Sequence, residues 1–318
     1  MKQETRSFYQ IAVRSALERI VRGLDDALDL GALARGAALS PLHFHRIFRG
    51  MLGETPLELQ RRLRLERAAT RLAQGDASVT SIAFDAGYET HESFSRAFRG
   101  AYSLSPSEFR TRASQAREGC QAPPRPELAA RSGIHFAPHV EAELVQSFDR
   151  AVLARGAFTQ GEGPMLIEIQ NMPEMRVAAV RHIGPYNAIS EAFARLGELA
   201  GGAGLVGDPA PTMLAIYHDD PEATSPAELR SDAALVVPED RALPPELTEL
   251  RIPAGRYARA THIGPYTLLG DAWARLMGEW LANSEHRVGS AMSYEIYRNT
   301  PLSAAPSELR TELYLPIA

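Results

Sequence analysis

Apolar residues recur at helical spacing through the first 117 residues, and no strand-like alternation interrupts them. Two hydroxyl-proline pairs read as helix starts, because the hydroxyl can cap the helix and proline is tolerated at its first position. The predicted helices run from Ser40 to about Gly50, from Thr55 to about Gly75, over 78–86 and over 91–101. This pattern predicts an all-α N-terminal region.

The same region contains an internal repeat at an offset of 50 residues. Phe44-x-Arg46-x-Phe48-Arg49-Gly50 aligns with Phe94-x-Arg96-x-Phe98-Arg99-Gly100. In each copy the two phenylalanines lie four apart on one helix face and are predicted to be core, whereas Arg46 and Arg96 point elsewhere. Two such copies joined by one long helix are typical of two helix-turn-helix units, with the arginine face available for DNA. The long helix carries an arginine run over 61–71, which we expect to pair with Glu58 and Glu66.

The C-terminal half alternates strand-like and helical runs, which predicts a domain that contains both helices and a sheet. The strand-like runs lie at 165–169, 176–182, 212–217 and 233–237. His-Ile-Gly-Pro-Tyr occurs at 182–186 and again at 262–266, each time before a helical run, so this half is a duplicated strand-helix-strand unit. His182 and His262 recur without a second ligand at metal spacing, and we expect both to serve the shared turn.

These patterns divide the chain into residues 1–117, a linker over 118–162, and residues 163–318. The linker contains a proline-rich stretch at 122–126 and a run at 140–153 that is able to form an amphipathic helix. Its cysteine, Cys120, is the only one in the chain, which excludes an internal disulfide and a cysteine-based zinc site.

Composition and charge narrow the function classes. The 318 residues are 45% hydrophobic, and the chain shows neither a leader segment nor an apolar run long enough to span a membrane, so a cytoplasmic protein is expected. Overall net charge is −5, but residues 1–118 carry 18 Lys and Arg against 14 Asp and Glu, a net of +4. The remainder carries 16 against 25, a net of −9, so only the N-terminal part suits a polyanion.

The N-terminal motifs closely resemble the DNA-binding domain of the AraC/XylS regulators. The resemblance rests on residues 40–49, 53–56 and 62–68 in the first half, and on 82–88, 93–99 and 105–110 in the second. It implies that the second helix of each helix-turn-helix enters a major groove, where arginine and glutamate can read base edges. The DNA contacts implied in this way are Leu42, His45, Arg46, His91, Glu92, Ser95 and Arg96.

The C-terminal half resembles GyrI-like effector-binding domains, through the two His-Ile-Gly-Pro-Tyr runs and Tyr294-Glu295-Ile296-Tyr297. The combined architecture is similar to that of Rob-type regulators. This resemblance implies an α+β fold with an antiparallel sheet. It also implies an aromatic cleft between the repeats, with a carboxylate that faces a small, cationic amphipathic effector. The residues expected there are Tyr217, Trp273, Tyr294, Glu295 and Tyr297.

The sequence thus predicts a ligand-responsive, sequence-specific DNA-binding transcription regulator that is not an enzyme and needs no cofactor or metal. The expected partners are double-stranded DNA, a small-molecule effector and RNA polymerase, and the expected state is a monomer or weak dimer. Two alternatives for the C-terminal domain remain open: a small-molecule hydrolase in which Glu295 activates water, or a module that only binds a protein.

Overall fold

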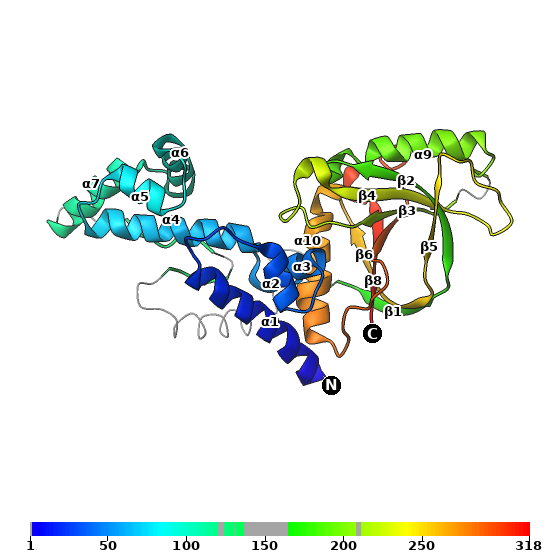
Figure 1. Ribbon diagram of the computed structural model, residues 1–318, viewed down its shortest axis with the longest axis horizontal. Helices are drawn as coiled ribbons and strands as arrows, with labels where there is room; N and C mark the ends of the chain where they lie inside the picture. Colours follow the sequence, from blue (N-terminus) through cyan, green and yellow to red (C-terminus); the bar gives the residue numbers. More distant parts are fainter. Residues whose placement is uncertain (1, 120–123, 131, 137–164, 208–210) are drawn as a thin grey trace. The chain divides into compact units, whose positions relative to one another are not determined.

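The computed structural model describes residues 2–119, 124–130, 132–136, 165–207 and 211–318 (Figure 1). Cys120 and the run at 140–153 lie outside these ranges. The chain forms two compact units: Met1–Gln10, Leu30–Gly50 and Phe158–Ala318 make up unit 1, and Ile11–Asp29 and Met51–Ala157 make up unit 2. None of the helices described is both long and apolar enough to cross a membrane. The domain boundaries given above stay a prediction.

Unit 2 is helical, as the apolar pattern predicts. Its helices are α4 (Pro56–Gln74), α5 (Val79–Asp85), α6 (His91–Tyr102) and α7 (Pro106–Arg117), and it also takes in part of α1 (Lys2–Arg22). Thr55 and Ser105 each form a capping box with the glutamate three residues later, which satisfies amide groups that a helix start leaves unpaired. The core includes Leu65, Leu72, Ile82, Phe94, Phe98 and Phe109, all buried.

The turn between α5 and α6 requires glycine. Gly87 has a φ of +81°, and a Cβ at this position would lie 2.5 Å from Nη1 of Arg64. The second helix-turn-helix therefore consists of α5, this turn and α6, in agreement with the predicted helices at 78–86 and 91–101.

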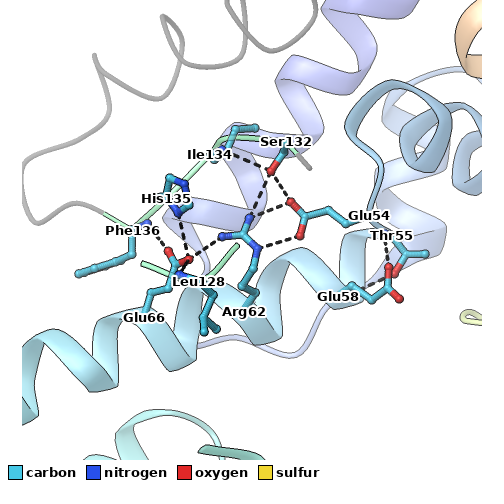
Figure 2. Close-up of polar contacts among 10 residues, drawn as sticks. All are labelled: Glu54, Thr55, Glu58, Arg62, Glu66, Leu128, Ser132, Ile134, His135 and Phe136. Atoms are coloured by element: carbon cyan, nitrogen blue, oxygen red, sulfur yellow. Dashed lines mark hydrogen bonds and ion pairs between the residues drawn. The ribbon is translucent and has the colours of Figure 1, made fainter. Parts of the chain in front are cut away.

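The arginine run of α4 pairs with Glu66 through Arg62, as predicted, whereas Arg67 and Arg71 pair with Asp25 and Asp85. Arg62 donates to both oxygens of Glu54 at 2.9 and 2.7 Å and to Glu66 at 2.8 Å (Figure 2). Glu66 also accepts the amide groups of Leu128 and Phe136, so it holds the segment that follows α7 against α4. The prediction that Glu58 pairs with an arginine is wrong, because its carboxylate caps Thr55 instead.

Unit 1 contains α2 (Leu30–Gly36) and most of α3 (Pro41–Leu52), together with the C-terminal sheet. The Ser40 hydroxyl accepts the amide of His43 at 3.2 Å, so the predicted N-cap is present. Phe44 and Phe48 are fully buried with ring centroids 5.7 Å apart, which confirms their expected core role.

Eight antiparallel strands form one sheet in the order β1-β6-β8-β7-β3-β4-β2-β5. They are β1 (Ile167–Met172), β2 (Met175–Ile183), β3 (Met213–Tyr217), β4 (Arg230–Val236), β5 (Thr248–Ile252), β6 (Gly255–Ile263), β7 (Tyr294–Tyr297) and β8 (Arg310–Pro316). Strands β2 and β4 recur 80 residues later as β6 and β8, and the two copies meet where β3 pairs with β7. The predicted duplicated antiparallel α+β unit is confirmed.

Each repeat places its Gly-Pro turn between a strand and a helix. The amides of Gly184 and Gly264 donate to carbonyl oxygens of Leu229 and Leu309 at 2.8 and 2.9 Å, and both glycines have a φ of +142°. Nε2 of each repeated histidine lies 3.1 or 3.4 Å from the carbonyl oxygen of the proline three residues later, to which it donates. The expected turn role of His182 and His262 is confirmed. Helix α9 (Ser190–Gly202) follows the first turn, and α10 (Leu269–Ala274) follows the second and continues as a π-helix to Trp280.

Candidate functional site

A buried carboxylate lies at the junction of the two repeats. Glu295 of β7 is 2% exposed and pairs in register with Ala215 of β3, its counterpart 80 residues earlier. One Oε accepts the indole Nε1–H of Trp273 at 2.6 Å, and the other accepts the hydroxyl of Tyr297 at 2.8 Å. Since Tyr297 donates to Glu295, it accepts from the Tyr217 hydroxyl, 3.1 Å away. The duplication thus places a tyrosine in each repeat, Tyr217 and Tyr297, but a carboxylate only in the second repeat, where Glu295 stands opposite Ala215.

Four of the five predicted effector residues lie together, and Tyr294 does not. Successive side chains of a strand point to opposite faces, so Glu295 and Tyr297 share one face while Tyr294 and Ile296 share the other. The Tyr294 ring stacks on Tyr314 at 4.7 Å in the buried cluster of that opposite face. The expectation for Tyr294 is therefore corrected: it is a core residue.

Two further tyrosines belong to the cluster and were missed from the sequence. Tyr186 packs edge-on against Tyr217 with centroids 4.8 Å apart, and Tyr266 packs against Tyr297 at 5.3 Å. They are the last residues of the two His-Ile-Gly-Pro-Tyr runs. The repetition itself was the available signal, because the turn that each histidine stabilises brings the tyrosine back towards the sheet.

Burial sets the electrostatics of the cluster. Loss of solvent raises the pKa of Glu295, although the hydrogen bonds from Trp273 and Tyr297 oppose that shift. Burial also raises the pKa of Tyr186 to about 12 and raises that of Tyr217 and Tyr297 further, so these hydroxyls stay neutral. The tyrosines of the cluster therefore carry no charge that could balance Glu295, and the carboxylate favours a cation beside it.

Arg46 of α3 supplies a positive charge at this place. Its Cζ lies 4.0 Å from the centroid of the Trp273 ring, in cation–π geometry. Its Nη1 is buried without a hydrogen-bond partner among the described residues. Burial lowers the pKa of Arg46 to about 10, and attraction to Glu295 partly offsets that shift. The guanidinium is held by the aromatic face and the field of the carboxylate.

Neighbouring residues of α3 also contact the C-terminal part of unit 1. Nδ1 of His45 lies 3.8 Å from Asp220, and Nε2 of His45 lies 3.6 Å from Glu222. Arg49 donates to Asp271 at 2.6 Å. Leu42 and His45 are each 7% exposed. The first set of predicted DNA contacts, Leu42, His45 and Arg46, is therefore covered in this structure.

The second set differs. His91, Glu92 and Arg96 of α6 are exposed and Ser95 is half-buried, while Phe94 and Phe98 point into the core of unit 2. The side of α6 opposite the core thus presents a cation, a carboxylate and small polar groups to solvent, the residue types that read base edges.

Comparison with known proteins covers both halves of the chain. Residues 33–112 match a family described as a helix-turn-helix domain, and residues 165–318 match the GyrI-like small molecule binding domain. A DNA gyrase inhibitor of Yersinia enterocolitica is 34% identical over 141 residues, which are 41% of this chain and 84% of that protein. The regulatory protein SoxS of Salmonella typhimurium is 31% identical over 104 residues, 33% of this chain and 97% of that protein. Among solved structures, the EcmrR C-terminal domain is 21% identical with a TM-score of 0.43, over 48% of this chain and 98% of that chain.

Proposed function

Because this chain belongs to the AraC-type helix-turn-helix regulators that carry a GyrI-like small-molecule binding domain, we propose that it reads a specific DNA sequence and binds a small cationic effector at Glu295. The observation that carries the effector assignment is a single buried carboxylate within an aromatic surround, with an arginine stacked on its tryptophan. RNA polymerase is the proposed protein partner, and the protein is proposed to act as a monomer or weak dimer.

DNA reading is supported by α6, on which His91, Glu92 and Arg96 are exposed. A bidentate arginine–guanine contact contributes about 1–3 kcal/mol of discrimination, so Arg96→Ala is expected to weaken binding by that amount and to relax specificity at one position. Sites are first selected from random DNA with the wild type, and both proteins are then measured against the selected site and its single-base variants.

Arg112 is the matched control, because it is exposed on α7 and its loss changes net charge equally. Arg112→Ala is expected to lower affinity evenly across sequences through lost phosphate attraction, or to leave it unchanged. Equal loss of specificity in the two variants would remove Arg96 from base reading.

Cation binding is supported by the hydrogen bonds of Glu295, which orient both oxygens while leaving its charge uncompensated by a direct ion pair among the described residues. Glu295→Gln keeps the shape and an acceptor for Trp273 but removes the charge. The substitution is expected to lower the affinity for a lipophilic cation much more than the affinity for a neutral compound of equal size, as measured by thermal shift and calorimetry.

The hydrolase alternative makes a different prediction for the same variant. A general base must accept a hydrogen bond from the water that it activates, and each Glu295 oxygen accepts one hydrogen bond, from Trp273 or Tyr297. Turnover of a bound compound that Glu295→Gln abolishes would favour the enzyme instead.

A further inference from the structure

We propose that the Glu295 site takes a planar, delocalised cation of the amidinium or guanidinium type, and that this ligand displaces Arg46 and so releases α3 for DNA. The proposal rests on the effector assignment above and adds the ligand class and its effect on DNA binding. In it, the guanidinium of Arg46 is the internal occupant of the effector site.

The geometry of Trp273 selects a flat cation. Its indole edge is tied to Glu295, so the ring is held in one orientation and presents its face to the guanidinium of Arg46 at 4.0 Å. A planar cation can stack on that face and keep its charge near the carboxylate, whereas an ammonium is a compact, strongly hydrated point charge that cannot stack. A ligand of the same shape as the arginine head group therefore fits the place that the arginine holds.

The guanidinium of Arg46 has one nitrogen whose hydrogen-bonding capacity is not satisfied in this place. Its Nη1 is buried without a hydrogen-bond partner among the residues described, which makes its burial costly. A free amidinium can place its own N–H groups without the constraint of a helix, and it therefore competes well with the side chain. The surrounding contacts of α3, between Arg49 and Asp271 and between His43 and Ser293, fix the helix but do not satisfy this nitrogen.

Occupation of the site excludes groove contact by Arg46. A side chain whose guanidinium stacks on Trp273 cannot reach a base edge, whereas its repeat counterpart Arg96 is exposed on α6. In the state described here, α6 is able to read DNA and α3 is not. Ligand binding and contact by α3 are then linked, because both require Arg46 to leave the cluster.

Gly50 provides a way to release α3 without substituting a side chain of the effector site. A Cβ built on Gly50 would lie 2.1 Å from the carbonyl oxygen of Ala274 and 2.5 Å from Cα of Gly278, so backbone atoms would have to move. Its repeat counterpart, Gly100, has nothing within 4 Å and is the matched control. Both glycines are helical, so alanine itself favours the helix at each position.

The test uses the full chain, benzamidinium as the ligand and neutral benzamide as its isostere. Gly50→Ala and Arg46→Ala are each expected to bind benzamidinium about tenfold or more tightly than wild type or Gly100→Ala, because the internal competitor is removed. Benzamide should show no such gain. On the DNA site selected from random sequences with the wild type, footprinting with a nuclease should show that wild type and Gly100→Ala protect mainly the half of the site read by α6. Benzamidinium, or Gly50→Ala alone, should extend protection to the other half.

The outcomes separate the two proposals. If benzamidinium binds with equal affinity to wild type, Gly50→Ala and Arg46→Ala, and Glu295→Gln still weakens it, the effector site stands and displacement of Arg46 is overturned. If none of these proteins binds benzamidinium or larger lipophilic cations, the effector assignment itself fails. If the Gly50→Ala protein is unfolded, the Arg46→Ala affinity alone decides the competition.

Discussion

Removal of Arg62 should destabilise unit 2 far more than removal of any exposed arginine of α4. Arg62 lies between Glu54 and Glu66, and the side chains of the three are 10%, 11% and 2% exposed. Arg62→Met preserves most of the side-chain volume and removes the charge. The variant leaves two buried carboxylates without their arginine, and Glu66 keeps only the contact with Nδ1 of His135 at 3.1 Å as a link to a basic side chain (Figure 2).

The magnitude follows from burial. Breaking a buried ion pair by removing one partner costs about 3–5 kcal/mol, because the remaining charge has lost water without gaining a partner. Arg71 pairs with Asp85 at 2.5 Å, but these side chains are 40% and 48% exposed, so Arg71→Met is expected to cost about 0–1 kcal/mol. The two variants should therefore differ by roughly 2–5 kcal/mol, at least about thirtyfold in the opening equilibrium.

Native-state hydrogen exchange measures this difference where it arises. The amides of Leu128 and Phe136 donate to Glu66 and should exchange much faster in Arg62→Met than in Arg71→Met. Combining Arg62→Met with Glu54→Gln and Glu66→Gln removes the stranded charges and should restore part of the protection. Equal exchange in the two single variants would show that the buried network does not stabilise the segment, and the reasoning would be refuted.

Two further predictions concern unit 1. Burial raises the pKa of Glu295, so its contribution to the stability of the ligand-free protein should fall as pH rises from about 4.3, its unfolded value, through the raised folded value. Affinity for a cation should rise over the same interval. Calorimetry and unfolding over a pH series should show both trends in the wild type and neither trend in Glu295→Gln. Gly264 has a φ of +142°, and a Cβ there would lie 3.3 Å from Nε2 of His262, so Gly264→Ala should lower the free energy of unfolding by about 1–3 kcal/mol. Gly197 lies in the middle of α9 with open space around it, so Gly197→Ala should raise that free energy by up to about 1 kcal/mol. Equal effects of the two substitutions in thermal unfolding would contradict the strained turn.

Local features of this protein follow from the sequence alone. The capping boxes at Thr55 and Ser105, the buried phenylalanine pairs and the Gly-Pro turns each depend on residues within a few positions of one another, so spacing and side-chain chemistry are sufficient to predict them. The two internal repeats made predictions over longer distances possible, because a duplicated motif predicts a duplicated structure. The turn role of the repeated histidines is an example.

The composition of the site was decided by contacts between distant segments. Strand alternation directs Tyr294 to the core and Tyr297 to the cluster, and the face to which each points depends on the pairing of β7 with β3 and β8. Tyr186 and Tyr266 join because each turn folds back onto the sheet. Arg46 has the same sequence context as Arg96, yet one is stacked on Trp273 and the other is exposed. No local pattern separates the two arginines, since the difference lies in a partner more than 200 residues away along the chain.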